Sequence, residues 1–225
     1  MLSAETRVWS RSKLSSAYLA AAIKFAPLTV EARDLACARG GRLVFSGVSF
    51  LVGAGALLAV TGPNGAGKSS LLRILAGLLR PQAGDLTFAP RDEEPLIHYL
   101  GHADSLKPGL TLRESLNFWA TLCAGRAQGS DVAKAATICG IGHALDLPAG
   151  VLSAGQRRRA GLARLLLSPR PLWLLDEPGA GLDAEGEALV GRLLESHLGA
   201  GGLAVAATHL PLPIAPDSLL RLGPQ

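Results

Sequence analysis

The chain has 225 residues, enough for one domain or for one domain that carries an additional lobe. Apolar residues make up 48%, which provides a sizeable core, but no uninterrupted apolar run of about 18 residues occurs, so no bilayer-spanning helix is predicted. The formal net charge is +4, and the basic residues are not interleaved with aromatic residues as in nucleic-acid-binding surfaces, so no nucleic-acid partner is expected.

Residues 1–27 differ in composition from the rest of the chain. They contain four basic residues and five serines, and Glu5 is their only acidic residue. This composition fits an organellar transit peptide, but it also fits an upstream start codon or a disordered tail, and we expect a disordered extension. The domain is therefore expected at residues 28–225. Its cysteines, Cys37, Cys123 and Cys139, are too far apart for a metal-ligand pair and indicate reduced thiols.

After the extension, short apolar segments alternate with segments of helical periodicity. Strands are predicted at 28–35, 43–52, 56–61, 84–88, 96–100, 172–175 and 203–207. Helices are predicted at 68–79, 111–123, 130–139, 153–167 and 184–198. Thr111, Ser130 and Ser153 are the expected N-cap residues, and Glu114 completes a capping box with Thr111. From residue 211 the end is short and rich in proline, and no strand is predicted there.

This alternation predicts an α/β fold with a mostly parallel sheet. The helices that begin at residue 111 interrupt it, so a helical lobe is expected at about 103–150. In the helix predicted at 68–79, one apolar face is expected from Leu71, Leu72, Leu75 and Leu78.

A glycine-rich loop follows the strand predicted at 56–61. Residues 62–69 read GPNGAGKS and fit the phosphate-loop pattern G-x-x-x-x-G-K-[ST] at every fixed position. Backbone N–H groups of such a loop converge on phosphate oxygens, and the helix that follows adds its N-terminal dipole. Lys68 is therefore expected to contact the β and γ phosphates of ATP, and Ser69 to bind Mg²⁺. The nucleotide-binding candidates of this segment are Gly62, Pro63, Asn64, Gly65, Ala66, Gly67, Lys68, Ser69 and Ser70.

Asp176 and Glu177 follow a second apolar strand. A carboxylate at the end of a buried strand is costly unless a charge compensates it. Hydrated Mg²⁺ provides that charge, since it accepts one or two carboxylates and retains water. Asp176 is therefore the second metal-ligand candidate.

The segment 152–156, LSAGQ, lies between the phosphate loop and this acidic strand end. Together these residues resemble the ATP-binding cassette (ABC) family over the chain from about Leu28 to its end. The resemblance implies a P-loop NTPase of the ABC ATPase fold, in which a RecA-like core carries an antiparallel β layer and a helical lobe. It also implies ATP hydrolysis by a dimer of nucleotide-binding domains that share their active sites.

The resemblance assigns a role to each matching residue. Glu177 corresponds to the catalytic glutamate that polarises the attacking water, and His209 to the switch histidine that senses the γ-phosphate. Ser153, Gly155 and Gln156 form the signature motif, which meets ATP bound by the other subunit. Asp183 lies in the loop that communicates across the dimer.

Two positions depart from the family pattern. His102 follows a strand end where most members have a metal-coordinating glutamine, so it is a candidate ligand of the metal or water. The aromatic residue that usually stacks on adenine is absent from its usual turn, and either Arg39 or Phe45 is expected to replace it.

The strings YLGH at 99–102, ESLNF at 114–118 and PLWLLDEP at 171–178 are similar to the haem-exporter-type ATPases of c-type cytochrome biogenesis. This resemblance implies integral membrane partners of the CcmB and CcmC type and coupling of hydrolysis to haem delivery or to release of a haem chaperone. It implies peripheral association with the cytoplasmic face of a bacterial inner membrane, or the matrix side of the mitochondrial inner membrane. An ABC ATPase for another solute is the alternative, and a non-transport ABC protein of translation or DNA repair is a further one.

Two surfaces remain open to interpretation. The basic run Arg157, Arg158 and Arg159 fits a solvated helix face, or a site that attracts phosphate or an acidic partner. The expected docking groove for the membrane subunit extends from about His102 to Leu116, with apolar contacts from Leu106, Leu110 and Leu112.

Overall fold

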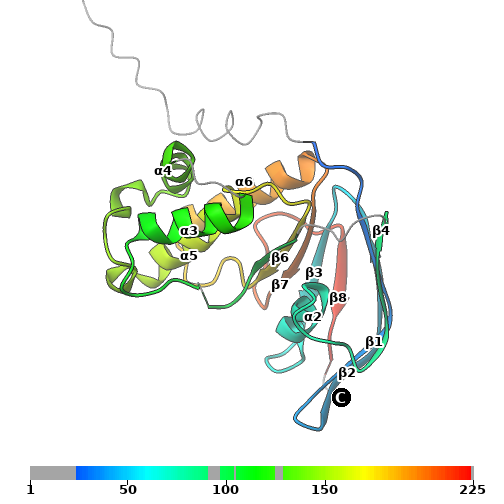
Figure 1. Cartoon of the computed structure of the whole chain (residues 1–225). Coiled ribbons are helices and arrows are strands. Elements are labelled where there is room, and N and C mark those ends of the chain that lie inside the picture. Colours follow the sequence, from blue (N-terminus) through cyan, green and yellow to red (C-terminus); the bar gives the residue numbers. More distant parts are fainter. Residues whose placement is uncertain (1–23, 91–96, 104, 125–128, 224–225) are drawn as a thin grey trace, which may run out of the picture.

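The computed structural model describes residues 24–90, 97–103, 105–124 and 129–223 (Figure 1). The predicted extension therefore lies outside the described residues except at 24–27. Within the described residues, no helix combines the length and the apolar character that crossing a membrane requires.

A small antiparallel sheet forms one side of the molecule. Its strands are β1 (Thr29–Arg39), β2 (Arg42–Val52) and β4 (Ala83–Ala89), in the order β2-β1-β4. The larger sheet contains β3 (Leu57–Thr61), β5 (Ile97–Leu100), β6 (Leu172–Asp176), β7 (Leu203–Ala207) and β8 (Ser218–Arg221), in the order β5-β6-β7-β3-β8. All of its strand pairs are parallel, so the predicted parallel core is confirmed.

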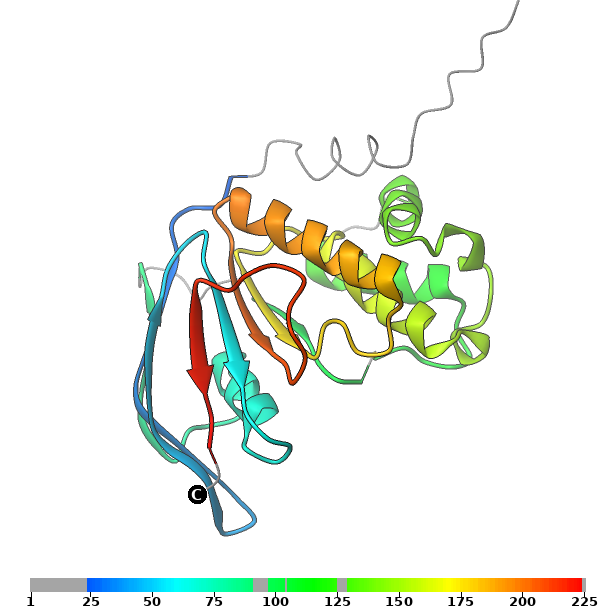
Figure 2. The ribbon, with the colours of Figure 1, turned by 180° about the vertical axis from the view of Figure 1, so that it is seen from behind.

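Helices cover both faces of the parallel sheet. Helix α2 (Lys68–Leu75) packs between that sheet and the antiparallel layer. The opposite face is covered by α6 (Ala184–Gly199) and by a lobe that contains α3 (Leu112–Ala124), α4 (Gly129–Ile138) and α5 (Ala154–Leu165) (Figures 1 and 2). Two short 3-10 turns, Gly142–Ala144 and Ala149–Val151, complete the lobe.

The alternation along β6 divides the core into two halves. Leu172 and Leu174 face α2 and the antiparallel layer, whereas Trp173 and Leu175 face α6 and the lobe. Because every position of β6 is buried, its sequence reads as a continuous apolar run. Asp176, the last residue of this buried strand, is therefore held in a fixed position at the carboxyl edge of the sheet.

Four details differ from the predictions. Helix α2 ends at Leu75 rather than at residue 79, since Gly77 adopts a positive φ of 69°, and Leu78 is consequently 66% exposed. The strand β8 was not predicted, and it pairs in parallel with β3. Helix α4 begins one residue before Ser130, the expected cap. Leu112 is fully buried in the lobe core and leaves only Leu106 and Leu110, both half-buried, for the predicted docking groove.

Two histidines are buried at the end of the sheet that lies away from the phosphate loop. The ring of His197 stacks on Trp173 with centroids 4.0 Å apart and meets the edge of Phe25 at 5.3 Å. His98 Nε2 lies 2.7 Å from the Ser168 carbonyl oxygen. Burial lowers the pKa of His197 to about 4 and that of His98 to about 3. Both rings are therefore neutral in the folded protein at physiological pH.

We expect the free energy of unfolding to fall as the pH falls below 6.5. The unfolded chain binds protons on these rings near pH 6.5, whereas the folded chain does not until about pH 4 or 3, so acid favours unfolding. Each ring contributes about 1.4 kcal/mol per pH unit in this window. Urea unfolding between pH 7 and pH 5 measures the slope. The variant His197→Phe keeps an aromatic ring against Trp173 and should reduce the slope by one proton; an unchanged slope would contradict the assignment.

Candidate active site

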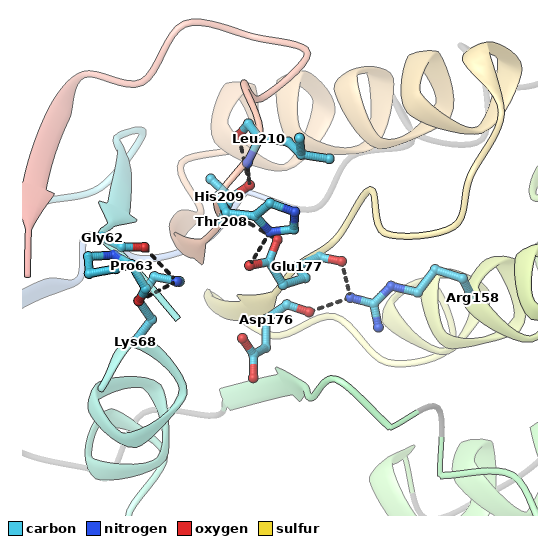
Figure 3. A network of polar contacts seen from close by, with 9 residues as sticks. All are labelled: Gly62, Pro63, Lys68, Arg158, Asp176, Glu177, Thr208, His209 and Leu210. Carbon is cyan, nitrogen blue, oxygen red and sulfur yellow. Dashed lines mark hydrogen bonds and ion pairs between the residues drawn. The ribbon is translucent and has the colours of Figure 1, made fainter. Parts of the chain in front are cut away.

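The phosphate loop connects β3 to α2 and presents the open N-terminus of the helix. Gly67 is the N-cap residue, with φ of 97° and no side-chain cap. The ammonium group of Lys68 donates hydrogen bonds to the carbonyl oxygens of Gly62 at 2.8 Å and Pro63 at 3.3 Å (Figure 3). The side chain is therefore folded across the loop, where it can interact with a phosphate that binds the backbone N–H groups.

Two glycines of the loop are required by packing as well as by access to phosphate. A Cβ on Gly62 would lie 2.2 Å from the carbonyl oxygen of Leu222, which follows β8. A Cβ on Gly67 would lie 2.6 Å from Val44 and 2.7 Å from Phe45 of the antiparallel layer. Both residues also adopt positive φ, which L side chains rarely do. The loop is thus fixed between the two sheets.

The acidic pair at the end of β6 faces the phosphate loop. Asp176 is 2% exposed, and its Oδ2 atom has no hydrogen-bond partner among the described residues. Glu177 adopts a φ of 53°, which is uncommon for a residue with a side chain, and its amide donates to the Ala207 carbonyl oxygen at 2.8 Å. A buried carboxylate oxygen without a partner is costly and fits a site for a cation.

His209 lies beside Glu177. Its Nδ1 atom is 2.9 Å from Oε1 of Glu177, and its backbone amide donates to Oε2 at 3.4 Å (Figure 3). The two residues follow β6 and β7, which are adjacent parallel strands, so their carboxyl ends lie at the same edge of the sheet. This arrangement can orient a water molecule next to a bound phosphate.

One cavity of about 440 Å³ collects most of the predicted site residues. Its lining residues are Arg39, Val44, Asn64, Gly65, Gly67, Lys68, Ser69, Ser70, His102, Asp176, Glu177 and His209. His102 follows the end of β5 and is exposed at the cavity. Ala66, another predicted residue of the phosphate loop, is buried. Phe45 is only 2% exposed, so the prediction that its ring could stack on adenine is wrong. Arg39, the other candidate for that contact, lines the cavity.

The signature residues line a second hollow, of about 580 Å³, together with Asp183. Ser153 caps α5: its Oγ accepts from the Gln156 amide at 3.1 Å, and the Ser153 amide donates to Gln156 Oε1 at 2.9 Å. A Cβ on Gly155 would lie 3.2 Å from the Gly181 carbonyl oxygen, so the two loops touch. The structure thus brings Ser153, Gly155, Gln156 and Asp183 together. The hollow that they line has no lining residue in common with the first cavity.

Two of the three adjacent arginines, Arg158 and Arg159, do not lie on a solvated face, so that interpretation is wrong for them. Arg158 is 3% exposed and donates to the carbonyl oxygens of Gly101 at 2.9 Å and Glu177 at 2.7 Å. The Arg159 side chain is 12% exposed and binds Asp183 Oδ1 at 2.7 Å. Asp183 also caps α6 by accepting from the Gly186 amide at 2.9 Å, and this bond, together with Arg159, lowers the pKa of its carboxyl group.

Comparisons with known proteins agree with this geometry. The family model described as ABC transporter matches residues 45–180. A protein of Rhodopseudomonas palustris (strain BisB5), named cytochrome c biogenesis ATP-binding export protein CcmA, is 50% identical over 198 residues, which are 86% of this chain and 98% of the relative. A protein of the same name from Bradyrhizobium diazoefficiens is 47% identical over 201 residues, which are 87% of this chain and 98% of the relative.

The fold has a solved counterpart. A putative ABC transporter ATP-binding protein from Pyrococcus furiosus superposes with a TM-score of 0.76 at 23% sequence identity, covering 86% of this chain and 97% of that one. This likeness supports the fold, and the family model and the relatives identify the activity as ATP hydrolysis. The chain belongs to the ABC transporter family of ATPases and, within it, to the group of ATP-binding proteins named CcmA.

Proposed function

We propose that the chain is the ATP-hydrolysing subunit of an ABC transporter complex in c-type cytochrome biogenesis. In this role it couples hydrolysis to haem delivery or to release of a haem chaperone at the inner membrane. The observation that carries the enzymatic part is the cavity in which Lys68 lies opposite Asp176 and Glu177. The names of the relatives carry the process.

In this proposal ATP binds the cavity with its phosphates on residues 62–70. Lys68 contacts the β and γ phosphates, and Arg39 stacks on the adenine by its guanidinium plane. Glu177 polarises the attacking water, and His209 holds the Glu177 carboxylate and senses the γ-phosphate. These two residues are the catalytic pair.

The residues also fit Mg²⁺. Asp176 has a buried oxygen without a protein partner, and Ser69 supplies a hydroxyl group to the same cavity. Mg²⁺ commonly binds through one or two carboxylates together with substrate phosphates and water, so this small donor set is sufficient. When bound, Mg²⁺ neutralises negative charge on the phosphate oxygens. His102 is the third proposed ligand, directly or through water.

The signature surface acts on ATP held by a second copy of the domain. Ser153 and Gly155 at the N-terminus of α5 are suited to a γ-phosphate, since this helix end presents backbone N–H groups. Within one chain the signature hollow shares no lining residue with the phosphate-loop cavity. We therefore propose a dimer of nucleotide-binding domains, in which Gln156 and Asp183 complete the shared sites.

The chain reaches the bilayer through partners of the CcmB and CcmC type, on the cytoplasmic face of the inner membrane. Leu106 and Leu110, which are both half-buried and follow His102 in the chain, are the proposed contacts. A short apolar surface of this kind suits a helix of a membrane subunit.

The process is tested by deletion in the native host. Loss of the gene should abolish haem staining of c-type cytochromes, and the wild-type chain should restore it, whereas Glu177→Gln should not. Immunoblots of the membrane fraction control for expression. Normal haem staining in the deletion strain would assign the ATPase to another solute.

The role of His102 is tested by two substitutions at one position. His102→Gln restores the residue type that most ABC ATPases have there and should preserve most of the ATPase rate. His102→Ala removes the polar group and should reduce the rate by roughly 10–100-fold, the range for a small misplacement of catalytic groups. Steady-state ATPase assays at several Mg²⁺ concentrations measure both effects. Equal rates in all three proteins would show that the histidine is only a loop residue.

A further inference from the structure

Three arginines, six residues apart in sequence, bind backbone carbonyl groups along the outer edge of β5 and at the residue that follows it. Arg158 and Arg164 of α5 donate to the carbonyl oxygens of Gly101 at 2.9 Å and Tyr99 at 2.6 Å. Arg170, which follows α5, donates to that of Ile97 at 3.0 Å. We call these three residues the arginine ladder. They bind every second carbonyl oxygen along this segment, because alternate carbonyl groups of an extended strand point to the same side. The ladder therefore joins α5, whose first turn carries the signature, to β5, which leads into His102.

Arg158 also binds the backbone at the end of β6 and directly after it. Its guanidinium group donates to the carbonyl oxygens of Asp176 and of Glu177 at 2.7 Å (Figure 3). It also donates to that of Pro178 at 3.3 Å. One side chain thus connects the loop after β5 to the loop after β6. A guanidinium group suits this position, since its planar fork presents five donors, whereas an ammonium group presents three from a single atom.

The contact with Glu177 falls on strained backbone. Glu177 has a φ of 53°, a conformation that persists in a residue with a side chain only when its surroundings fix it. Three hydrogen bonds hold the peptide groups of this residue: its amide to Ala207, and its carbonyl oxygen from the Ala180 amide at 3.0 Å and from Arg158. The direction of the Glu177 carboxylate therefore depends on Arg158.

We propose that Arg158 is a positioning residue for ATP hydrolysis. It holds the loops that carry His102, Asp176 and Glu177 in register with α5, and it links their alignment to the signature two residues earlier in the chain. This inference rests on the proposed roles of Asp176 and Glu177. Arg158 itself contacts the rear of the site through carbonyl groups and does not line the nucleotide cavity.

Arg164 provides the matched control. It is also buried and lies on the same helix, where it donates to the Tyr99 carbonyl oxygen of β5 and packs its guanidinium group over the ring of Trp119 in α3. If arginine in the ladder only stabilises the fold, Arg158→Lys and Arg164→Lys should have similar consequences. If Arg158 positions the catalytic loops, only Arg158→Lys should impair turnover of the folded protein.

The experiment uses membrane vesicles in which the full chain is co-expressed with its CcmB- and CcmC-type subunits. Four proteins are compared: wild type, Arg158→Lys, Arg158→Gln and Arg164→Lys. In the vesicles, the ATPase kcat and KM are measured per folded chain. On the purified chains, the MgATP affinity and the melting temperature are measured. We expect both lysine variants to melt at lower temperature. Arg158→Lys and Arg158→Gln should lose roughly 10–100-fold in kcat, the range for a small misplacement of catalytic groups. Their MgATP affinity should stay within about twofold of wild type, because a change confined to kcat indicates lost alignment rather than lost binding.

Two results would overturn the inference. A wild-type kcat in either Arg158 variant would remove the positioning role, and so would an equal loss of kcat in Arg164→Lys. Glu177→Gln in the same vesicles separates this failure from that of the proposed function. If Glu177→Gln hydrolyses ATP at the wild-type rate, the catalytic assignment itself is wrong; if it is inactive while Arg158→Lys is normal, only the inference about Arg158 fails.

Discussion

Replacing Glu177 by glutamine should reduce ATP hydrolysis by about 10²–10⁴-fold, the usual contribution of a positioned general base. The amide has the shape of the carboxylate and can still accept a hydrogen bond from the His209 amide, so the loop should keep its conformation. It cannot take a proton from water, however. The variant should therefore bind MgATP with wild-type affinity and accumulate as an ATP-bound dimer.

Size-exclusion chromatography with and without MgATP measures the dimer, and a phosphate-release assay of the assembled complex measures the rate. Glu195→Gln is a suitable control, because Glu195 is an exposed glutamate of α6 that lines neither nucleotide hollow. Hydrolysis by Glu177→Gln at the wild-type rate would contradict the assignment of Glu177 as the base.

Replacing Lys68 by alanine should weaken MgATP binding by about tenfold or more. A hydrogen bond from a charged group contributes about 1.5–3 kcal/mol, and the ammonium group of Lys68 is the one that lies across the phosphate loop. Calorimetric titration with MgATP measures the change.

The control for this variant is Arg73→Ala, which removes a positive charge from the last turn of the same helix. It should bind MgATP as tightly as wild type. Because Lys68 also bonds to the Gly62 and Pro63 carbonyl oxygens, Lys68→Ala should be checked by its melting temperature before the affinities are compared. An affinity equal to that of wild type would mean that Lys68 only stabilises the loop.

The sequence was most informative where several local signals coincide. The phosphate loop combines a buried strand, required glycines and a helix start, so its position was predicted to within a residue. The capping box at Thr111 and the N-cap at Ser153 were also predicted. The first is confirmed by reciprocal hydrogen bonds with Glu114, and the second by the hydrogen bond from the Gln156 amide to Ser153 Oγ. In these segments the interactions lie within four residues, which a sequence pattern can record.

Features that depend on distant contacts escaped prediction. The strand β8 has only four residues, and its pairing with β3 bridges more than half of the chain, so no local periodicity indicates it. Arg158 appears in the sequence as one of three adjacent basic residues, which usually indicates a solvated face. The Arg158 side chain is buried because it binds backbone carbonyl groups of two loops. Every residue has a backbone carbonyl group, so the sequence does not indicate which of them will bind an arginine. The exposure of Leu78 has a similar origin, since Gly77 ends the helix before that turn.

The arginine ladder has one more consequence, for the solubility of the protein. β5 is the outermost strand of the parallel sheet, and an outermost apolar strand with unpaired carbonyl groups is a template for strand addition by another chain. Many proteins avoid such aggregation by shortening that strand or by placing a lysine on it. Here the guanidinium groups bind three successive outward-pointing carbonyl oxygens at this edge, so these oxygens cannot accept hydrogen bonds from a strand of another chain.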